Sequence, residues 1–346
     1  MYRTNTPPHL LGMTRKELQE LAESLGQPGF RGRQIAEWLY KRNAGSLDQM
    51  TDLPAAFRSR LAESSALYRD TILNQIRSPD GTTKFLLELQ DHQRIESVLL
   101  PYEERVSVCV STQVGCAMAC GFCATGIGGF IRDLTAGEIV DEVLTLQRES
   151  VRRISHVVYM GMGEPLLNYD NVVRSLHLLN DEVGIGMRHI TVSTVGITPR
   201  IQKLAHDKLQ ITLAISLNAP NDEVRSRIMP IAARYPLRGL IEACREYAEE
   251  THRRVTFEYL LIRDVNDAPG QAHELVALLR GLLCNVNLIP YNAVEGLLLK
   301  RPTKGRVQGF RSILENAGIV VTQRLERGHT IAAACGQLRR RSGSDV

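Results

Sequence analysis

The sequence predicts an α/β fold in which a small helical domain and a β extension precede a partial, TIM-like (β/α)6 barrel. Three observations support this prediction. Apolar residues follow helical spacing up to about residue 66, short strand patterns follow up to about residue 100, and strands and helices alternate after residue 105. A regular alternation of strands and helices is typical of a parallel sheet.

The composition fits a globular protein with a sizeable core. The chain has 346 residues, of which 43% are hydrophobic and 23% are charged, as in ordinary soluble domains. It has no apolar run long enough to cross a membrane, and its first residues lack the apolar core of a signal peptide. We therefore expect a cytoplasmic protein with no membrane partner. The net charge of +4 permits an anionic partner without requiring one.

The predicted helical domain covers residues 1–68. Three segments in it have helical spacing: 14–26, 30–43 and 53–65. The first begins with Thr14 and Glu17 in the spacing of a capping box, and it ends at a glycine. One side of the domain is basic, through Arg31, Arg33, Lys41 and Arg42.

Residues 69–105 are predicted to form the β extension. Its strand candidates are 71–78, 85–90 and 93–101, and Asp80-Gly81 between the first two is a clear hairpin signal.

The predicted barrel covers residues 106–325. Its six strand candidates are 106–112, 156–162, 189–194, 211–216, 255–262 and 284–290. The helix candidates between and after them are 135–150, 168–181, 198–207, 236–250 and 269–283. The glycine fingerprint of a dinucleotide-binding fold does not follow the first strand, which favours a partial barrel over a doubly wound sheet.

The chain is expected to finish with a strand at the sheet edge and a loop. The edge strand is 319–323, and the segment 326–346 is a loop that carries Cys335 and a basic tail, RRRSGSDV, expected to be disordered.

Three of the seven cysteines lie within eight residues, at Cys116, Cys120 and Cys123. An odd, clustered set argues against a disulfide scaffold and for metal or redox chemistry. Their C-x3-C-x2-C spacing fits a 4Fe–4S cluster, whose usual ligands are thiolates, with one iron left open. A zinc site is the alternative, although zinc usually takes four ligands in two pairs. The motif resembles that of the radical S-adenosylmethionine (SAM) superfamily, in which the open iron holds SAM.

Polar residues follow the ends of successive predicted strands, where the active site of a barrel lies. They are Gly163, Glu164, Ser193, Ser216, Leu217, Asn218 and Asn292. We expect this set to bind SAM: the glycine lets a ligand approach the backbone, and the carboxylate of Glu164 can accept hydrogen bonds from an amino group.

The chain as a whole resembles the radical-SAM methyltransferases of 23S ribosomal RNA that modify adenine C2, and their relatives that modify C8. The segments that carry the resemblance include VSTQVGCAMACGFCATG, MGMGEPLLNYDNV, AISLNAP, NLIPYN and AACGQL. The last is highly specific, because a C-terminal cysteine in that setting is not general among radical-SAM enzymes. The resemblance implies one 4Fe–4S cluster on Cys116, Cys120 and Cys123, and two SAM molecules per turnover.

The resemblance also implies a covalent relay. Adenine C2 and C8 are electron-poor, so they do not attack the SAM methyl group directly. Cys335 is expected to take a methyl group first, Cys109 to release the product by forming a disulfide with it, and Glu96 to act as general base. Asn218 stands where many members have His, and acidic residues found in many members are missing near Thr330 and Ala332.

The implied substrate is adenosine 2503 of 23S rRNA in bacterial reference numbering, with adenosine 37 of tRNA as a further candidate. The implied electron donor is a flavodoxin or ferredoxin. Two other interpretations stay open: a C8 methyltransferase, and a non-catalytic Fe–S or zinc protein that binds RNA.

Overall fold

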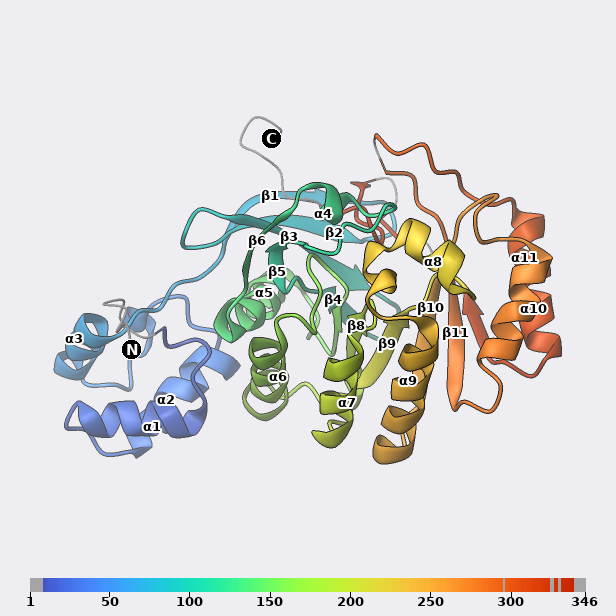
Figure 1. Ribbon diagram of the computed structural model, residues 1–346. Coiled ribbons are helices and arrows are strands. Elements are labelled where there is room, and N and C mark those ends of the chain that lie inside the picture. Colours follow the sequence, from blue (N-terminus) through green and yellow to red (C-terminus); the bar gives the residue numbers. More distant parts are fainter. Residues whose placement is uncertain (1–8, 295, 324–326, 329–330, 339–346) are drawn as a thin grey trace.

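The protein is described by a computed structural model that covers residues 9–294, 296–323, 327–328 and 331–338. Its centre is one sheet of ten strands, in the order β1-β2-β3-β4-β7-β8-β9-β10-β11-β12 (Figure 1). The antiparallel part contains β1 (Thr71–Arg77), β2 (Thr83–Glu88) and β3 (Arg94–Pro101), the last of which pairs with β4 (Val106–Cys109). All later neighbours in the sheet are parallel.

The parallel strands after β4 coincide with the predicted ones. They are β7 (His156–Tyr159), β8 (Ile190–Thr194), β9 (Thr212–Ser216), β10 (Val255–Leu261), β11 (Cys284–Pro290) and β12 (Val321–Gln323). The predicted α/β class with a parallel, barrel-like sheet is confirmed, and so is the edge strand near residue 320. Because β1 and β12 stand at opposite ends of the strand order, the sheet is an open arc.

Helices connect the parallel strands. They are α5 (Ala136–Glu149), α6 (Tyr169–His177) continued by η3 (Leu178–Val183), α7 (Thr198–His206), α8 (Asp222–Ile228) followed by η5 (Pro230–Ala233), α9 (Leu237–Thr251), α10 (Pro269–Leu278) and α11 (Lys304–Asn316); a short turn, η4 (Met187–His189), precedes β8. Figure 1 shows α5, α6, α7 and α9 side by side along one side of the sheet. None of the described helices is both long and apolar enough to cross a membrane.

The N-terminal part is helical, as predicted. It contains α1 (Arg15–Ser24), α2 (Phe30–Ala36), η1 (Glu37–Lys41), η2 (Leu47–Gln49) and α3 (Ala55–Ser64). The start of α1 is fixed by a reciprocal capping box, in which Thr14 accepts from the Glu17 amide and Glu17 accepts from the Thr14 amide. Figure 1 shows these helices at one end of the molecule, and α10 and α11 at the other.

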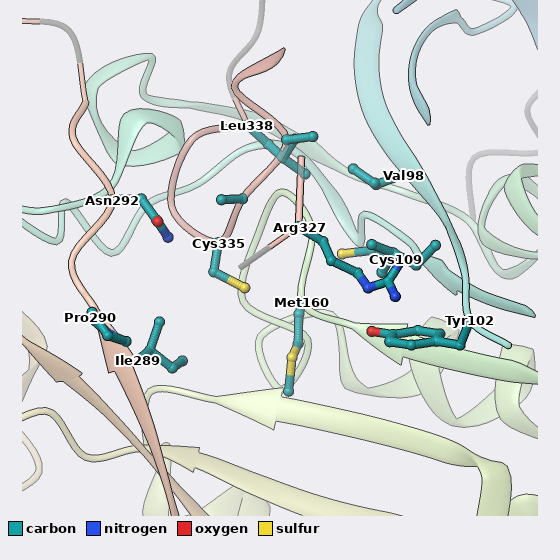
Figure 2. A pocket seen from close by; sticks show the side chains of 13 residues that line it. Val98, Tyr102, Cys109, Met160, Ile289, Pro290, Asn292, Arg327, Cys335 and Leu338 are labelled. Atoms are coloured by element: carbon teal, nitrogen blue, oxygen red, sulfur yellow. The ribbon is translucent and has the colours of Figure 1, made fainter. Parts of the chain in front are cut away.

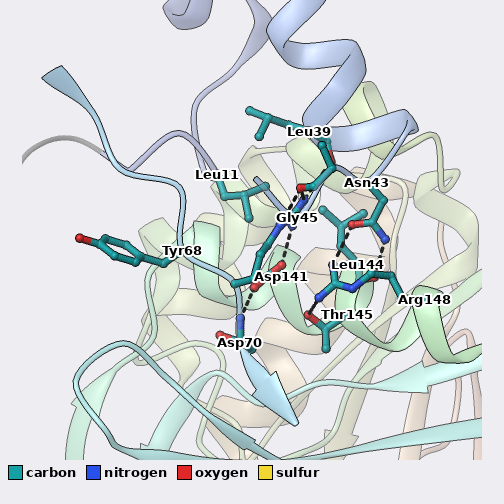
Figure 3. Close-up of polar contacts among 12 residues, drawn as sticks. Leu11, Leu39, Asn43, Gly45, Tyr68, Asp70, Asp141, Leu144, Thr145 and Arg148 are labelled. Atoms are coloured by element: carbon teal, nitrogen blue, oxygen red, sulfur yellow. Dashed lines mark hydrogen bonds and ion pairs between the residues drawn. The ribbon is translucent and has the colours of Figure 1, made fainter. Parts of the chain in front are cut away.

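A buried charge cluster joins this helical part to α5 (Figure 3). The Arg69 guanidinium donates to the Asp141 carboxylate at 2.6 Å and to the Ala44 carbonyl at 2.6 Å. The Asp70 amide donates to the other Asp141 oxygen, at 2.6 Å. Asn43 adds a bond to the Leu144 carbonyl, at 2.6 Å. Since the main apolar core also runs through both parts, the helices pack on the sheet as one body.

A small hairpin beside the sheet was not predicted. It pairs β5 (Gln113–Gly115) with β6 (Phe130–Asp133), and α4 (Ala124–Ile127) lies between these strands in the chain. The cysteine motif lies in this connection, so the hairpin closes the loop that carries it. The basic tail at 339–346 lies outside the described residues.

Candidate active site

The three clustered cysteines line one cavity at the carboxyl ends of the parallel strands. The cavity encloses about 160 Å³, and Cys116, Cys120 and Cys123 are in its wall. The loop is held because the Cys116 amide donates to the Gly129 carbonyl at 2.8 Å. Gly115 permits this close approach: its φ is +81°, and a Cβ there would lie 1.9 Å from the Gly129 oxygen.

The surroundings of these thiols fit a positively charged iron cluster. Burial and the nearby Cys123 sulfur raise the pKa of Cys116 to about 12, and burial raises the pKa of Cys120 far above its usual value. Without a cation the two thiols stay protonated, whereas a bound metal deprotonates its thiol ligands. Within the described ranges, no three His, Cys, Asp or Glu side chains lie close enough together to hold a single metal ion. Thiolates are the usual ligands of a 4Fe–4S cluster, and the three thiols line one cavity, so these residues fit such a cluster.

The strand ends supply the opposite wall of the same cavity. Five of the residues predicted to bind SAM line it, namely Gly163, Glu164, Ser193, Ser216 and Asn218. Leu217 is not among the lining residues; its side chain is fully buried and its carbonyl accepts from Arg225. Asn292 lines a neighbouring cavity instead.

The Glu164 side chain is held in place by hydrogen bonds from backbone amides of the protein. One carboxylate oxygen accepts from the Leu166 amide at 3.0 Å and the other from the Val195 amide at 2.8 Å, which ties the loop after β7 to the end of β8. Burial raises the pKa of Glu164 to about 7. Gly163 beside it has a φ of +103°, and a Cβ there would lie 2.7 Å from the Gln113 side chain. Any larger residue would therefore displace this corner of the cavity.

A second, smaller cavity contains the two other cysteines of interest. Cys109 comes from the end of β4 and Cys335 from the C-terminal loop, and both line this space of about 40 Å³. Figure 2 shows both sulfur atoms facing the same cavity, with Met160 below them and Asn292 beside Cys335. Cys335 also lines the cluster cavity, as do Met160 and Ile289. Cys335 thus stands where the two cavities meet.

The loop around Cys335 is bonded to the cluster loop. The Ala124 amide of α4 donates to the Gly336 carbonyl at 2.7 Å, and the Thr125 hydroxyl donates to the Leu338 carbonyl at 2.5 Å. Because α4 starts directly after Cys123, the position of Cys335 depends on the same segment that carries the three clustered cysteines.

Glu96 lies inside β3 and is 1% exposed. It is not among the residues that line either cavity, but it shares a sheet face with Val98, which lines the second cavity and pairs with Cys109. Its carboxylate forms an ion pair with the Lys84 ammonium at 3.1 Å. Glu96 thus lies on the same sheet face as Cys109 without lining the cavity that Cys109 and Cys335 share.

Sequence reasoning missed three charged residues at the site: Lys84, Arg225 and Glu258. The fully buried Arg225 donates to the carbonyls of Leu217 and Val195, which joins the ends of β8 and β9; burial lowers its pKa to about 10. Glu258 of β10 lines the cluster cavity. The available signal was a charged residue inside an apolar strand pattern at Glu258, and one directly before such a pattern at Lys84.

Comparison with known proteins agrees with this geometry. The Radical SAM superfamily model matches residues 110–276, and the model of the ribosomal RNA large subunit methyltransferase N-terminal domain matches residues 8–67. The chain is 51% identical over 333 residues to the probable dual-specificity RNA methyltransferase RlmN of Gloeobacter violaceus, covering 96% of this chain and 95% of that protein. This chain belongs to the RlmN family.

Other members support the assignment. The probable dual-specificity RNA methyltransferase RlmN of Thermosynechococcus vestitus is 50% identical over 330 residues, covering 95% of this chain and 98% of that protein. A crystal structure of a radical SAM methyltransferase from Sphaerobacter thermophilus superimposes with a TM-score of 0.93 at 47% identity, covering 96% of this chain and 99% of that one. The predicted family and fold are therefore confirmed, and RlmN membership implies an Fe–S cluster and SAM.

Proposed function

We propose that the protein methylates C2 of adenosine 2503 in 23S rRNA, and adenosine 37 of tRNA, through a methyl group carried on Cys335. The observation that supports this most directly is the position of Cys335, which lines both the cavity with the three clustered cysteines and the cavity with Cys109. A thiol in that place can receive a carbon atom on one side and be attacked by a second thiol on the other.

Cys116, Cys120 and Cys123 would hold the 4Fe–4S cluster, and the five strand-end residues in the cavity wall would hold SAM. When bound, the cluster and SAM supply a 5′-deoxyadenosyl radical that can remove a hydrogen atom from a methyl group. Leu217 would serve by keeping the strand end in place, since its carbonyl and amide bond Arg225 and Glu258, and Asn292 would face the base from the second cavity. Glu164 orders the wall because its oxygens hold two backbone amides.

The relay depends on two thiols and one carboxylate of the chain. The Cys335 sulfur takes a methyl group from SAM by nucleophilic displacement, and after hydrogen removal its carbon joins the electron-poor adenine carbon. Glu96 accepts the proton that the adenine carbon must lose, and the unpaired electron of the adduct would pass to the redox group that Cys116, Cys120 and Cys123 would hold. The Cys109 thiolate then attacks the Cys335 sulfur; an S–S bond forms, the S–C bond breaks, and its electron pair stays with the CH2 carbon on the base, which becomes a methyl group by taking up a proton.

RNA contact is assigned to the helical part, for which residues 1–68 remain the proposed domain. Arg33, Lys41 and Arg42 are exposed there, and exposed cations attract the phosphate backbone. The base must leave its stack to reach the cavities. A flavodoxin or ferredoxin is the proposed electron donor, and the cytoplasm is the proposed compartment because RNA and reduced thiols are found there.

The test is anaerobic reconstitution with iron and sulfide, followed by incubation with SAM, a reductant and an rRNA fragment. We expect 5′-deoxyadenosine and 2-methyladenosine to form together, and Cys335→Ser to form no methyladenosine. A digest that contains 8-methyladenosine and no 2-methyladenosine would reject the C2 assignment. RNA binding without any cleavage of SAM would reject the enzymatic function altogether.

A further inference from the structure

Lys84 is a buried lysine that contacts the proposed general base, Glu96, and the loop that carries Cys335. Its side chain is 4% exposed. Its ammonium lies 3.1 Å from a Glu96 carboxylate oxygen and donates to the Ala332 carbonyl at 3.1 Å. The first contact is within the sheet, whereas the second reaches the loop three residues before Cys335. One cation therefore connects the proposed base to the methyl-carrying loop.

The strand register explains how Lys84 reaches this place. Lys84 of β2 pairs with Val98 of β3, and Val98 pairs in turn with Cys109 of β4. Directly paired residues present their side chains on the same face of a sheet. Lys84, Glu96 and Cys109 thus share the face that the Cys335 loop covers.

Burial makes this arrangement sensitive to the loss of either partner. Removing an ammonium ion from water is costly unless an opposite charge and hydrogen-bond acceptors replace the water. Glu96 supplies the charge and the Ala332 carbonyl supplies a further acceptor. Ala332 itself has a φ of +49°, a left-handed conformation that a non-glycine residue adopts only when its surroundings hold it there. The bond from Lys84 is one of the contacts that hold it.

We propose that Lys84 is a positioning residue. It holds the Glu96 carboxylate and the Cys335 loop in one arrangement while the adenine carbon loses its proton to Glu96 and the thioether bond is broken. This inference rests on the proposed function. Methyl transfer from SAM to Cys335 does not require Glu96, and the Cys335 loop keeps its bonds to Ala124 and Thr125 without Lys84, so we expect Lys84 to act mainly on the later steps. Its removal should separate the early half of the reaction from the late half.

The experiment compares Lys84→Met, which keeps the length of the stem, with Lys84→Arg, which keeps the charge and the donors. Lys203→Met is the matched control, because the Lys203 ammonium pairs with Asp170 at 3.2 Å and its side chain is 47% exposed on an outer helix. Each reconstituted protein is given SAM, reductant and the rRNA fragment. Four quantities are followed: methylation of Cys335, 5′-deoxyadenosine, methyladenosine, and protein covalently attached to RNA.

In a single turnover of Lys84→Met, with enzyme in excess over RNA, we expect Cys335 methylation and 5′-deoxyadenosine to stay within about twofold of wild type. Methyladenosine release should fall by about a hundredfold, the lower end of what a positioned proton acceptor contributes, and the protein–RNA adduct should accumulate. Lys84→Arg should recover most of the release, and Lys203→Met should match wild type. A purely structural role would lower all four quantities together and would not depend on charge.

Two results would overturn the proposal: release by Lys84→Met at the wild-type rate, or Lys84→Arg as defective in release as Lys84→Met. If Lys84→Met fails to fold, Lys84→Gln replaces it, since Gln keeps a donor for Ala332 without the charge. Adduct accumulation in that variant supports the proposal, and wild-type release contradicts it. Failure of wild type to methylate Cys335 would instead reject the proposed function.

Discussion

At the scale of single residues, the position of each cysteine in the fold separates those that line a cavity and can react there from those that only pack against neighbouring residues. Cys335 and Cys109 line a cavity, whereas Cys244 is fully buried in α9. Cys284 is half-buried at the start of β11. Burial raises the pKa of Cys284 to about 11, so its thiol stays protonated at neutral pH. Spacing in the sequence already set the cluster cysteines apart, but the meeting of Cys109 with Cys335 depends on the fold.

Replacing Cys109 tests its role as the resolving thiol. In Cys109→Ser the hydroxyl cannot form a disulfide, so the carbon bridge between Cys335 and the base should persist. We expect a covalent protein–RNA adduct on a denaturing gel and no free methyladenosine. Cys284→Ser is the matched control and should release product normally. Product release by Cys109→Ser would show that another group resolves the adduct.

Replacing Gly163 tests the corner of the SAM cavity. Gly163→Ala needs a left-handed conformation at φ +103° and places a Cβ against Gln113, so we expect at least about 1 kcal/mol of destabilisation and weaker SAM binding by calorimetry. The control is Gly239→Ala in α9, where no atom lies within 4 Å of the new Cβ. That variant should be more stable by about 0.5–1 kcal/mol. Equal effects of the two changes would contradict the assigned geometry.

At the scale of elements, helix α5 presents acidic groups to two different partners. Asp141 faces the helical part, whereas the fully buried Glu142 faces the sheet, where it accepts from the Ser97 hydroxyl and the Ser111 amide. Burial raises the pKa of Glu142 well above its usual value of 4.5. Glu142 therefore holds its proton in the folded state at a pH where the unfolded chain has lost it.

The difference between the pKa values of Glu142 in the folded and unfolded states decides whether the free energy of unfolding rises or falls with pH. A raised pKa in the folded state stabilises the protein fully below about pH 4.5, and this stabilisation is lost as the pH rises toward the folded-state value. Glu142→Gln removes the titration and can still bond both serines. We expect its free energy of unfolding, relative to wild type, to increase between pH 5 and pH 7 in urea titrations. A constant difference would mean that Glu142 is ionised in the folded protein.

Most helices and strands could be predicted because the apolar residues in each long segment repeat with one spacing, that of a helix or that of a strand. The six parallel strands and the helices α5, α6, α7, α9 and α10 follow from that pattern. The β5–β6 hairpin could not be predicted, since its strands have three and four residues and enclose the cysteine loop. Leu217 was selected for its place at a strand end, yet its side chain points into the core, because position in the chain does not fix side-chain direction in a loop.

At the scale of the whole molecule, contacts between distant segments assemble the site. Lys84 and Ala332 are 248 residues apart in the sequence, and the Thr125 hydroxyl meets the Leu338 carbonyl across 213 residues. A single sequence contains no signal for such pairs. The family resemblance could name Cys335 and Cys109, but it could not name the lysine that joins β2 to the C-terminal loop.

The attachment of the helical part can be tested at its buried ion pair. Asp141→Ala leaves the Arg69 side chain, which is 9% exposed, without its carboxylate, so we expect a loss of about 3 kcal/mol in the free energy of unfolding. Asp170→Ala is the control: Asp170 is 87% exposed in its pair with Lys203, and exposed pairs contribute less than about 1 kcal/mol. Similar losses from the two variants would show that the Arg69–Asp141 pair does not anchor the helices.

The bond from α4 to the C-terminal loop has a consequence for synthesis. A growing chain emerges from its N-terminal end, so the strands and the loop with the three clustered cysteines are complete before residue 335 appears. The reactive sulfur therefore arrives on a surface that is already formed, and docking beside α4 is among the last events of maturation. On the proposed function, a nascent molecule could acquire its inorganic cofactor before that moment but would have no acceptor for the alkyl group, which would set an order on the two loading events.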